Sequence, residues 1–546
     1  MSRFRLIGAS AGLAALVAAA ALSAPALASA PPSPGCPASW PEMGHDPLHS
    51  GQASVCPSAG AVIDQGDAAT LTPHWFMSTQ AAVTAEPAVV AGVVYFGDAG
   101  GTFRAVNAST GALKWSFTST DRHQTGFGEF ASSPEVIRLP GQKDAWVFVG
   151  GGGTLYALDS VTGKVVWSRD VDPGRPTSAI EIESSPVVDL ATNPPEVMVG
   201  SDDNGSSKIQ VTGIQAFNAK TGALQWKYEP ERNAVVHELG DDGHGDACGD
   251  VWSSPALDAP AGLVVFGTGN CGDQTAAVAH HDFAVNSGIF ALSAATGARQ
   301  WSFFEPANQY DTGQAADSGS GDDDFGSSAL IVHGVALAKG VKRNLVVEAS
   351  KSGYVYAVDE ATGTKVWQDE PSQAGQLSPQ LVGSVGGTIG AMALGQSGGR
   401  SAVFMTSAVP LPLAGDGVDT GPTPPSVSPD PSLVSDPTRA FSLHAVDLAT
   451  GAVLWQDPLA VPSYAPVTYS DGVLLAPSTT GFAVGAYNAD TGGLLWASPS
   501  GAADSGGAAI VGPSVFLGTG TSFGSAGPTE VPPQAFGLWS YGLTGS

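Results

Sequence analysis

The chain has 546 residues and a formal charge of −28, from 50 acidic against 22 basic side chains. This charge argues strongly against nucleic acid or an anionic membrane surface as a binding partner, because both carry dense negative charge. The length alone would suggest three or four domains, but a closed array of repeats can form one large domain of this size.

Residues 1–28 are expected to form an export signal. Arg3 and Arg5 precede an apolar run over residues 6–22, and small residues at 26–28 provide a cleavage site. We therefore expect a secreted, extracytoplasmic protein with no membrane span after signal cleavage. An uncleaved N-terminal anchor is the alternative, because the run is near the shortest length that spans a bilayer.

An N-terminal extension over residues 29–70 is expected to hold one disulfide. The chain has four cysteines, which in an exported protein suggest two disulfides with three possible pairings. Proximity favours Cys36–Cys56 and Cys248–Cys271, and each bond would close a loop of about twenty residues and add about 3 kcal/mol of stability. The sequence contains no CxxCH motif. We therefore expect no haem, and any redox reaction would need a separate electron acceptor.

A short motif occurs seven times from residue 105 onward. In every copy, Thr-Gly is followed by Trp four residues after the glycine, at Trp115, Trp167, Trp226, Trp301, Trp367, Trp455 and Trp496. The residues before Thr-Gly favour a β-strand, and the pattern D/N-x-x-T-G, present in six copies, favours a hairpin turn. One local motif repeated at intervals of about forty residues or more indicates a repeat architecture.

A second repeated signal precedes the first. It begins with small residues, at Ser132, Ser184, Ser253, Ser327 and Ala465, and another β-prone run follows each copy. The unit therefore has four strands. Small residues at the start of the first strand are what an innermost strand, crowded around an axis, requires.

The two ends of the array complement each other. Trp75 stands in a strand with no motif before it, and the final strand, residues 533–543, has no Thr-Gly-Trp after it. We therefore predict an all-β fold for residues 71–546, an eight-bladed β-propeller of four-stranded blades closed by pairing of the N- and C-terminal strands. A solenoid of strands is the alternative, but it gives no reason for the ends to match. Residues 410–439, rich in Pro, Ser and Asp, are expected to be a disordered insertion.

Acidic residues recur at one position in four successive blades. Three residues before the first serine of the second signal stand Glu129, Glu181, Asp250 and Asp324. The start of the first strand and the end of the second lie on one face of an antiparallel blade. We therefore expect an arc of carboxylates at one mouth of the channel, suited to a hard cation such as calcium. The alternative is a set of solvated acids on surface loops.

The repeat A-[LV]-D-x-x-T-G-x-x-x-W resembles that of pyrroloquinoline quinone (PQQ) dehydrogenases and their non-catalytic relatives, over nearly all of the chain after residue 71. "DVWSSPALD", "GTGN", "GDDDFGSS" and "EASKSGYVYAVD" resemble the polyvinyl-alcohol type in particular. The resemblance implies PQQ and calcium as cofactors. It implies that Trp252 is the floor on which the quinone stacks and that Lys351 is a cation near its oxygens.

The same resemblance implies a calcium ligand at Asn270 and a base for the alcohol proton at Asp322 or Asp324. Asp322 and the arc residue Glu181 are further candidate metal ligands. The third blade departs from the family, because it lacks the usual calcium-binding Glu and has Thr212 where an Arg is usual; Asp202 or Asp203 would replace that ligand. The vicinal cysteines of many alcohol-oxidising members are also missing.

Two functions remain open at this point. One is an exported PQQ- and calcium-dependent alcohol dehydrogenase that uses a small alcohol or polyol and an external electron acceptor. The other is a non-catalytic propeller that binds a protein or a glycan.

Two further patterns resemble known kinds of binding site. "GTGNCG", residues 267–272, fits G-x-G-x-x-G, but no helix is expected after it, so we do not expect a dinucleotide site. His244, Asp246, Cys248, His280 and His281 could surround zinc, but a disulfide at Cys248 would remove that ligand.

Overall fold

The computed structural model describes residues 39–53, 62–175, 177–203, 212–239, 248–271, 283–305, 324–372, 387–407, 442–458, 463–478, 483–502, 504, 506–520 and 535–544. Their helices are short 3₁₀ turns, η1 (Ala68–Thr70), η2 (Phe283–Asn286) and η3 (Ala338–Gly340). None of the helices in these ranges has the length and apolar character needed to span a bilayer. The export signal at 1–28, Cys36, Cys56 and the insertion at 410–439 lie outside the described residues.

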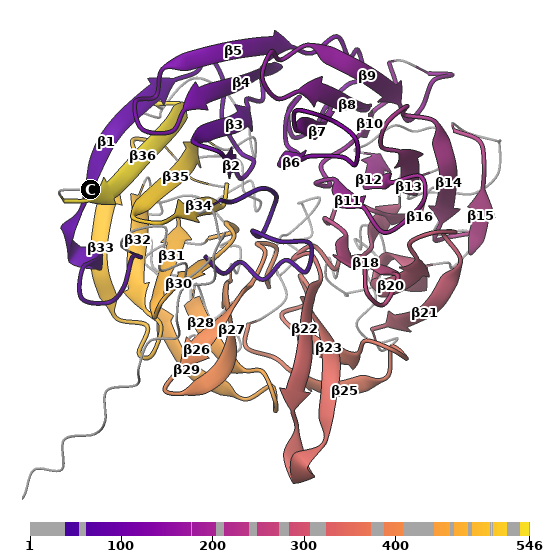
Figure 1. The fold of residues 1–546 in the computed structure, drawn as a ribbon. Coiled ribbons are helices and arrows are strands. Elements are labelled where there is room, and N and C mark those ends of the chain that lie inside the picture. The colour runs from indigo at the N-terminus through magenta and orange to yellow at the C-terminus, as the bar shows by residue number, and fades with distance from the viewer. Residues whose placement is uncertain are drawn as a thin grey trace, which may run out of the picture. The chain divides into compact units, whose positions relative to one another are not determined.

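Antiparallel sheets stand side by side in a ring within the unit Cys36–Ser546 (Figure 1), and we number them as blades 1 to 8. Blades 1 to 4 are β2 (Ala88–Val90), β3 (Val93–Gly97), β4 (Thr102–Asn107) and β5 (Leu113–Thr118); β6 (Glu135–Ile137), β7 (Trp146–Gly151), β8 (Thr154–Asp159) and β9 (Val165–Asp170); β11 (Val187–Asp189), β12 (Glu196–Asp203), β13 (Gly213–Asn218) and β14 (Leu224–Glu229); and β17 (Ala256–Asp258), β18 (Leu263–Gly267), β20 (Gly288–Ser293) and β21 (Arg299–Phe304).

Blades 5 to 8 are β22 (Leu330–Ala336), β23 (Lys342–Ala349), β24 (Val355–Asp359) and β25 (Lys365–Asp369); β26 (Ala393–Ser397), β27 (Arg400–Thr406), β28 (Ser442–Asp447) and β29 (Val453–Pro458); β30 (Thr468–Ser470), β31 (Val473–Pro477), β32 (Ala483–Asn488) and β33 (Leu494–Pro499); and β34 (Ala508–Val511), β35 (Ser514–Thr519), β36 (Gly537–Leu543) and β1 (Leu71–Ser78). Blade 3 also carries β10 (Ile180–Glu181) and β15 (Ala234–Val236), and β16 (Cys248–Asp250) pairs with β19 (Gly269–Cys271).

The ring closes through the two ends of the array. Strand β1 pairs antiparallel with β36, with Leu71 opposite Leu543 and Ser78 opposite Gly537. Figure 1 shows the indigo β1 beside the yellow β36. The predicted eight-bladed propeller with shared terminal strands is confirmed, and the solenoid is excluded.

The repeated Thr-Gly and Trp residues form the joints between neighbouring blades. Trp115 of blade 1 donates from Nε1 to the carbonyl oxygen of Ser160 in the turn of blade 2, at 2.9 Å. A Cβ on Gly163 of that turn would lie 2.4 Å from Cε3 of Trp115, so the indole packs directly on the glycine. The same Nε1 bond to the next blade is made by Trp75, Trp167, Trp226, Trp301, Trp367 and Trp455. Each repeat therefore takes part in two contacts. Its Trp packs on the next blade, and its Thr-Gly turn receives the Trp of the preceding blade.

The repeated serines form a second set of joints, close to the axis. In blades 3, 4 and 5 the second serine of the signal accepts a hydrogen bond from the backbone N–H of the second serine in the preceding blade. The donor–acceptor pairs are Ser133 to Ser185 at 3.1 Å, Ser185 to Ser254 at 2.9 Å and Ser254 to Ser328 at 2.9 Å. Small polar residues are thus needed here because the chain is crowded and its buried N–H groups need acceptors.

The segment 39–53 runs across the centre of the ring, where Figure 1 shows it in indigo. It bonds in turn to the innermost strands, which would otherwise leave free edges. The acceptors Pro41, Pro47, Leu48, Ser50 and Gly51 receive N–H groups from Val136, Leu257, Ile331, Leu394 and Tyr469, in that order. The stretch before β1 is therefore part of the propeller's packing.

Candidate functional site

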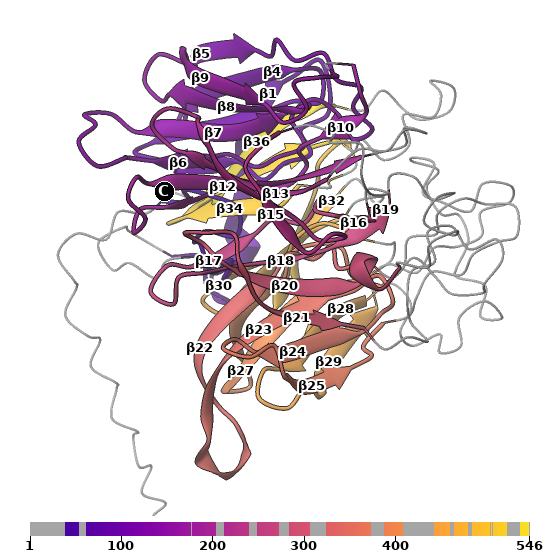
Figure 2. The same ribbon diagram turned by 90° about the vertical axis from the view of Figure 1, so that its right-hand side faces the viewer.

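An axial cavity of about 170 Å³ lies where the innermost strands begin. Every blade contributes to its wall, through Ala85, Ala131, Glu183, Trp252, Gly326, Gly390, Tyr464 and Gly507. Trp252 therefore lies half-buried at the axis. Figure 2 shows β10, β16 and β19 at one face of the ring, and these strands carry the candidate acids Glu181 and Asp250.

The ring of Trp252 is held between two glycines. A Cβ on Gly326 would lie 1.8 Å from Cη2 of Trp252, and a Cβ on Gly269 would lie 2.3 Å from its Nε1. Both distances are shorter than real Cβ contacts, so a side chain at either glycine would force this contact to shift. The indole of Trp252 therefore packs directly against the backbone of both glycines.

Lys351 connects this indole to Asp324. Its Nζ lies 4.9 Å from the Trp252 ring centroid and donates to Oδ2 of Asp324 at 2.7 Å. Its backbone N–H also bonds the carbonyl oxygen of Asp324, at 2.9 Å. Both side chains are almost completely removed from solvent. The result is a desolvated ion pair against an aromatic face, where electrostatic interactions are strong.

Three carboxylates gather beside the axis in blade 3. Glu181, Glu183 and Asp202 each offer an oxygen within 4.8 Å of the others. The pairing of β10 with β12 brings them together, because Glu181 stands opposite Asp202 in that ladder. Burial raises the pKa of Asp202 well above its usual value, and the charges of Glu183, Glu181 and Asp250 raise it further. Several buried carboxylate oxygens at one point suit a hard cation.

The structure therefore brings the predicted residues into two groups. Glu181, Asp202 and Asp250 form one, and Asp324, Lys351 and Trp252 form the other. Glu129, the remaining acid of the arc, is half-buried, and burial raises its pKa.

Three candidates cannot be placed in full. Asp322 lies outside the described residues. The backbone of Asn270 lies in β19 and that of Asp203 in β12, but their side chains are outside the described part of the chain.

Glu183 was not among the sequence candidates, although a signal for it was present. It stands two residues after Glu181, immediately before the serines of its blade, so both side chains project to the same side of extended chain. Glu183 thus adds a third carboxylate beside Glu181 and Asp202.

The cysteine and dinucleotide patterns occupy neighbouring positions. Cys248 is disulfide-bonded, and its register partner in the β16–β19 pair is Cys271. The described part of the G-x-G-x-x-G pattern lies in β18 and β19, and residues 272–282 lie outside the described residues. His244, Asp246, His280 and His281 lie outside the described residues.

Sequence comparison finds two families. Residues 58–376 match the family described as glucose/ethanol/alcohol dehydrogenase, beta-propeller domain, and residues 351–525 match that of the outer membrane protein assembly factor BamB. The quinone alcohol dehydrogenase subunit of Komagataeibacter europaeus is 28% identical over 330 residues, 55% of this chain and 42% of the relative. The polyvinylalcohol dehydrogenase of a Pseudomonas species is 26% identical over 327 residues, 57% of this chain and 48% of the relative. The match thus spans less than half the length of these curated relatives.

Solved structures agree with the fold. The quinohemoprotein alcohol dehydrogenase from Comamonas testosteroni superposes with a TM-score of 0.65 at 18% identity, covering 93% of this chain and 81% of the other. BamB from Moraxella catarrhalis gives a TM-score of 0.50 at 14% identity, covering 86% and 99%. At these identities the likeness shows a shared propeller fold.

Proposed function

Because the chain belongs to the PQQ-repeat family of glucose/ethanol/alcohol dehydrogenase β-propellers, we propose that it is an exported PQQ- and calcium-dependent alcohol dehydrogenase. The observation that supports this most is the buried Lys351–Asp324 pair against the Trp252 indole, at the axis of the ring. The substrate would be a small alcohol or polyol. Electrons would leave to an external acceptor, with no haem on this chain.

The residues present fit the two cofactors. The half-buried face of Trp252 would hold the flat quinone, with Lys351 near its oxygens. Glu181, Glu183 and Asp202, with Asn270 and Asp322 as further candidates, would hold calcium, since carboxylate and amide oxygens are its preferred ligands. When bound, PQQ supplies a two-electron acceptor that calcium polarises.

A carboxylate of the site would accept the hydroxyl proton of the alcohol. Oxidation of an alcohol to the carbonyl compound removes a hydride from carbon and a proton from the hydroxyl group. We assign that proton to the carboxylate of Asp324 or Asp322. Lys351 would orient Asp324 through its hydrogen bond, and the burial of both groups would exclude competing water.

Export is part of the proposal. The export signal expected at residues 1–28 and the disulfide-bonded Cys248 both support an oxidising compartment, because cytosolic thiols are kept reduced. The Cys248–Cys271 pairing is supported by their direct opposition in β16 and β19.

A binding propeller for a protein or glycan is the second candidate. Its support is the match of residues 351–525 to the BamB family and the character of Thr212. Thr212 is buried, and its Oγ1 has no hydrogen-bond partner among the described groups, where the dehydrogenase pattern has an Arg. A site with such a change can keep its shape after losing its reaction.

Dye-linked alcohol oxidation by the protein reconstituted with PQQ and calcium tests the proposal. We expect turnover, and we expect the double variant D322N/D324N to lose it by at least about a hundredfold, the usual contribution of a general base. Asp144, whose side chain is 39% exposed, provides a matched control, and D144N should react like the wild type. A double variant that keeps the wild-type rate, or a wild type that oxidises no alcohol, would favour the binding propeller.

A further inference from the structure

A second cluster of ligand-type side chains lies between blades 4 and 5. Asp258 ends β17, the innermost strand of blade 4, His333 lies in β22, and Glu360 follows β24 in the turn of blade 5. Because innermost strands begin at the Trp252 end, Asp258 lies at the opposite face of the ring from the candidate quinone site. The cluster is therefore separate from the site described above.

The three donor groups converge. One nitrogen of His333 and one oxygen each of Asp258 and Glu360 lie within 4.8 Å of one another. Nε2 of His333 is 2.7 Å from Oδ2 of Asp258 and 3.9 Å from Oε1 of Glu360. One imidazole nitrogen and two carboxylate oxygens form a ligand set that zinc accepts.

Both carboxylates are held by their other oxygen. The backbone N–H of Ala261 bonds Oδ1 of Asp258 at 3.2 Å, and Nδ2 of Asn344 bonds Oε2 of Glu360 at 2.8 Å. Asn344 is itself fixed by the N–H of Gly334, at 3.0 Å. Oδ2 of Asp258 and Oε1 of Glu360 are thereby directed toward His333. Outer hydrogen bonds that orient ligands in this way are typical of metal sites.

A separate observation points to a missing ligand. Oε1 of Glu360 is buried in a residue that is only 4% exposed, and no N–H group of the described residues donates a hydrogen bond to it. This oxygen faces Nε2 of His333 across 3.9 Å. A desolvated carboxylate oxygen without a donor is costly, and a cation between these atoms would satisfy it.

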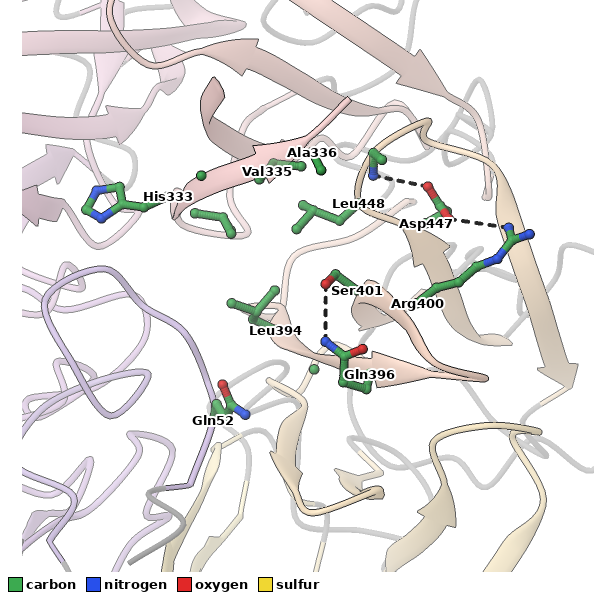
Figure 3. Close-up of a pocket in the computed structure, with 14 residues that line it drawn as sticks. Gln52, His333, Val335, Ala336, Leu394, Gln396, Arg400, Ser401, Asp447 and Leu448 are labelled. Carbon is green, nitrogen blue, oxygen red and sulfur yellow. Dashed lines mark hydrogen bonds and ion pairs between the residues drawn. The ribbon is translucent and has the colours of Figure 1, made fainter. Parts of the chain in front are cut away.

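The orientation of His333 agrees with this. Its backbone borders a cavity of about 480 Å³ between blades 5 and 6, but Figure 3 shows its ring pointing away from Leu394 and Ser401. The ring turns instead toward Asp258 of blade 4. With 43% of its side chain exposed, His333 also leaves a path from solvent to the cluster.

We propose that Asp258, His333 and Glu360 bind a divalent transition-metal ion, with Zn²⁺ the best match, and that the ion joins blades 4 and 5. Three protein ligands leave a fourth position for water. Calcium fits poorly, because it takes six to eight oxygen ligands and does not select imidazole. Trp301 of blade 4 donates to the carbonyl oxygen of Glu360 at 2.7 Å, so the ion would reinforce an existing joint.

Calorimetric titration with ZnCl₂ in excess calcium tests the proposal on the full-length protein without PQQ. We expect the wild type to bind one more zinc equivalent than H333A does, and N344A to bind that zinc at least about tenfold more weakly, as changes to outer hydrogen bonds usually do. The control is H237A, because His237 is an exposed histidine of another blade that bonds the carbonyl oxygen of Gln225. It should match the wild type, and zinc bound elsewhere cancels in this comparison.

Two further measurements protect the test. H333Q replaces H333A if the alanine variant melts lower than the wild type in the absence of zinc. Anomalous diffraction at the zinc edge should then show the ion between the three side chains in the wild type. Equal zinc stoichiometry and affinity in wild type and both His333 variants, or no anomalous peak at this position, would overturn the proposal.

Discussion

Lys351 donates a hydrogen bond to Asp324 at 2.7 Å in a place where neither side chain has appreciable contact with water. The two residues come from the two ends of blade 5's first hairpin, just before β22 and just after β23. Their contact also fixes the ammonium above the Trp252 ring. A charge pair of this kind is costly to break on one side only, because the remaining charge stays buried.

We therefore predict that K351M lowers the free energy of unfolding by about 3–5 kcal/mol, because it removes the ammonium from beside a buried carboxylate. The double variant K351M/D324N should recover most of that loss, since no ionised group then lacks its counterion. Urea unfolding of wild type, both single variants and the double variant gives the coupling energy. A K351M protein as stable as the wild type would show that Lys351 does not stabilise the buried Asp324 carboxylate.

The joints between blades predict a difference between two glycine variants. Gly163 and Gly141 both have positive φ, of 70° and 83°, so alanine is strained at either position. A Cβ on Gly163 would overlap Trp115, whereas a Cβ on Gly141 would have nothing within 4 Å. We expect G163A to be less stable than G141A by about 1–3 kcal/mol, the usual cost of overpacking. Equal melting temperatures of G163A and G141A would contradict the packing of Trp115 on Gly163.

A pH effect is expected where the central segment meets blade 2. Burial raises the pKa of Glu135 to about 8, and burial together with the charge of Glu135 raises that of Glu42. The folded state therefore keeps a proton that the unfolded chain loses near pH 4, so it binds more protons across that interval. Stability should fall as pH rises from about 5 to about 8, by up to about 1.4 kcal/mol per pH unit for one group. E135Q should flatten this slope, and an unchanged slope in melting temperature against pH would count against the assignment.

The Cys248–Cys271 bond is predicted to raise the free energy of unfolding of the protein by about 3 kcal/mol, because it restricts the unfolded chain. Peptide mapping of non-reduced secreted protein should recover the two cysteines in one linked pair, and C248S/C271S should melt at a lower temperature. Recovery of both residues as free thiols would contradict the pairing and the export proposal together.

The repeats explain how much of this could be predicted from sequence. The β-prone runs and the fixed Thr-Gly to Trp spacing are local, so they predicted the blades and the pairing of the Trp75 strand with the last strand. The path of residues 39–53 carries no repeat, because its hydrogen bonds depend on six different blades. The cluster of Asp258, His333 and Glu360 was missed for a similar reason: residues 75 apart meet only because adjacent blades stack.

The same limit applies to the quinone site. Asp324 was a sequence candidate because it precedes a repeated serine signal, and Trp252 and Lys351 were candidates through the family resemblance. The two glycines that hold the Trp252 ring were not, because Gly269 and Gly326 act through a contact in space rather than through their turn geometry.

Calorimetric titration of the metal-free protein with PQQ in calcium tests the central claim most directly. The account predicts saturable binding of one PQQ that requires calcium and is lost or weakened at least tenfold in G326A, where the new Cβ would displace Trp252. A matching rise in melting temperature should appear in the wild type, because ligand that binds only the folded state stabilises it. If the wild type showed no binding heat and no thermal shift with PQQ and calcium, the proposed dehydrogenase function would be contradicted and the binding-propeller function would be favoured.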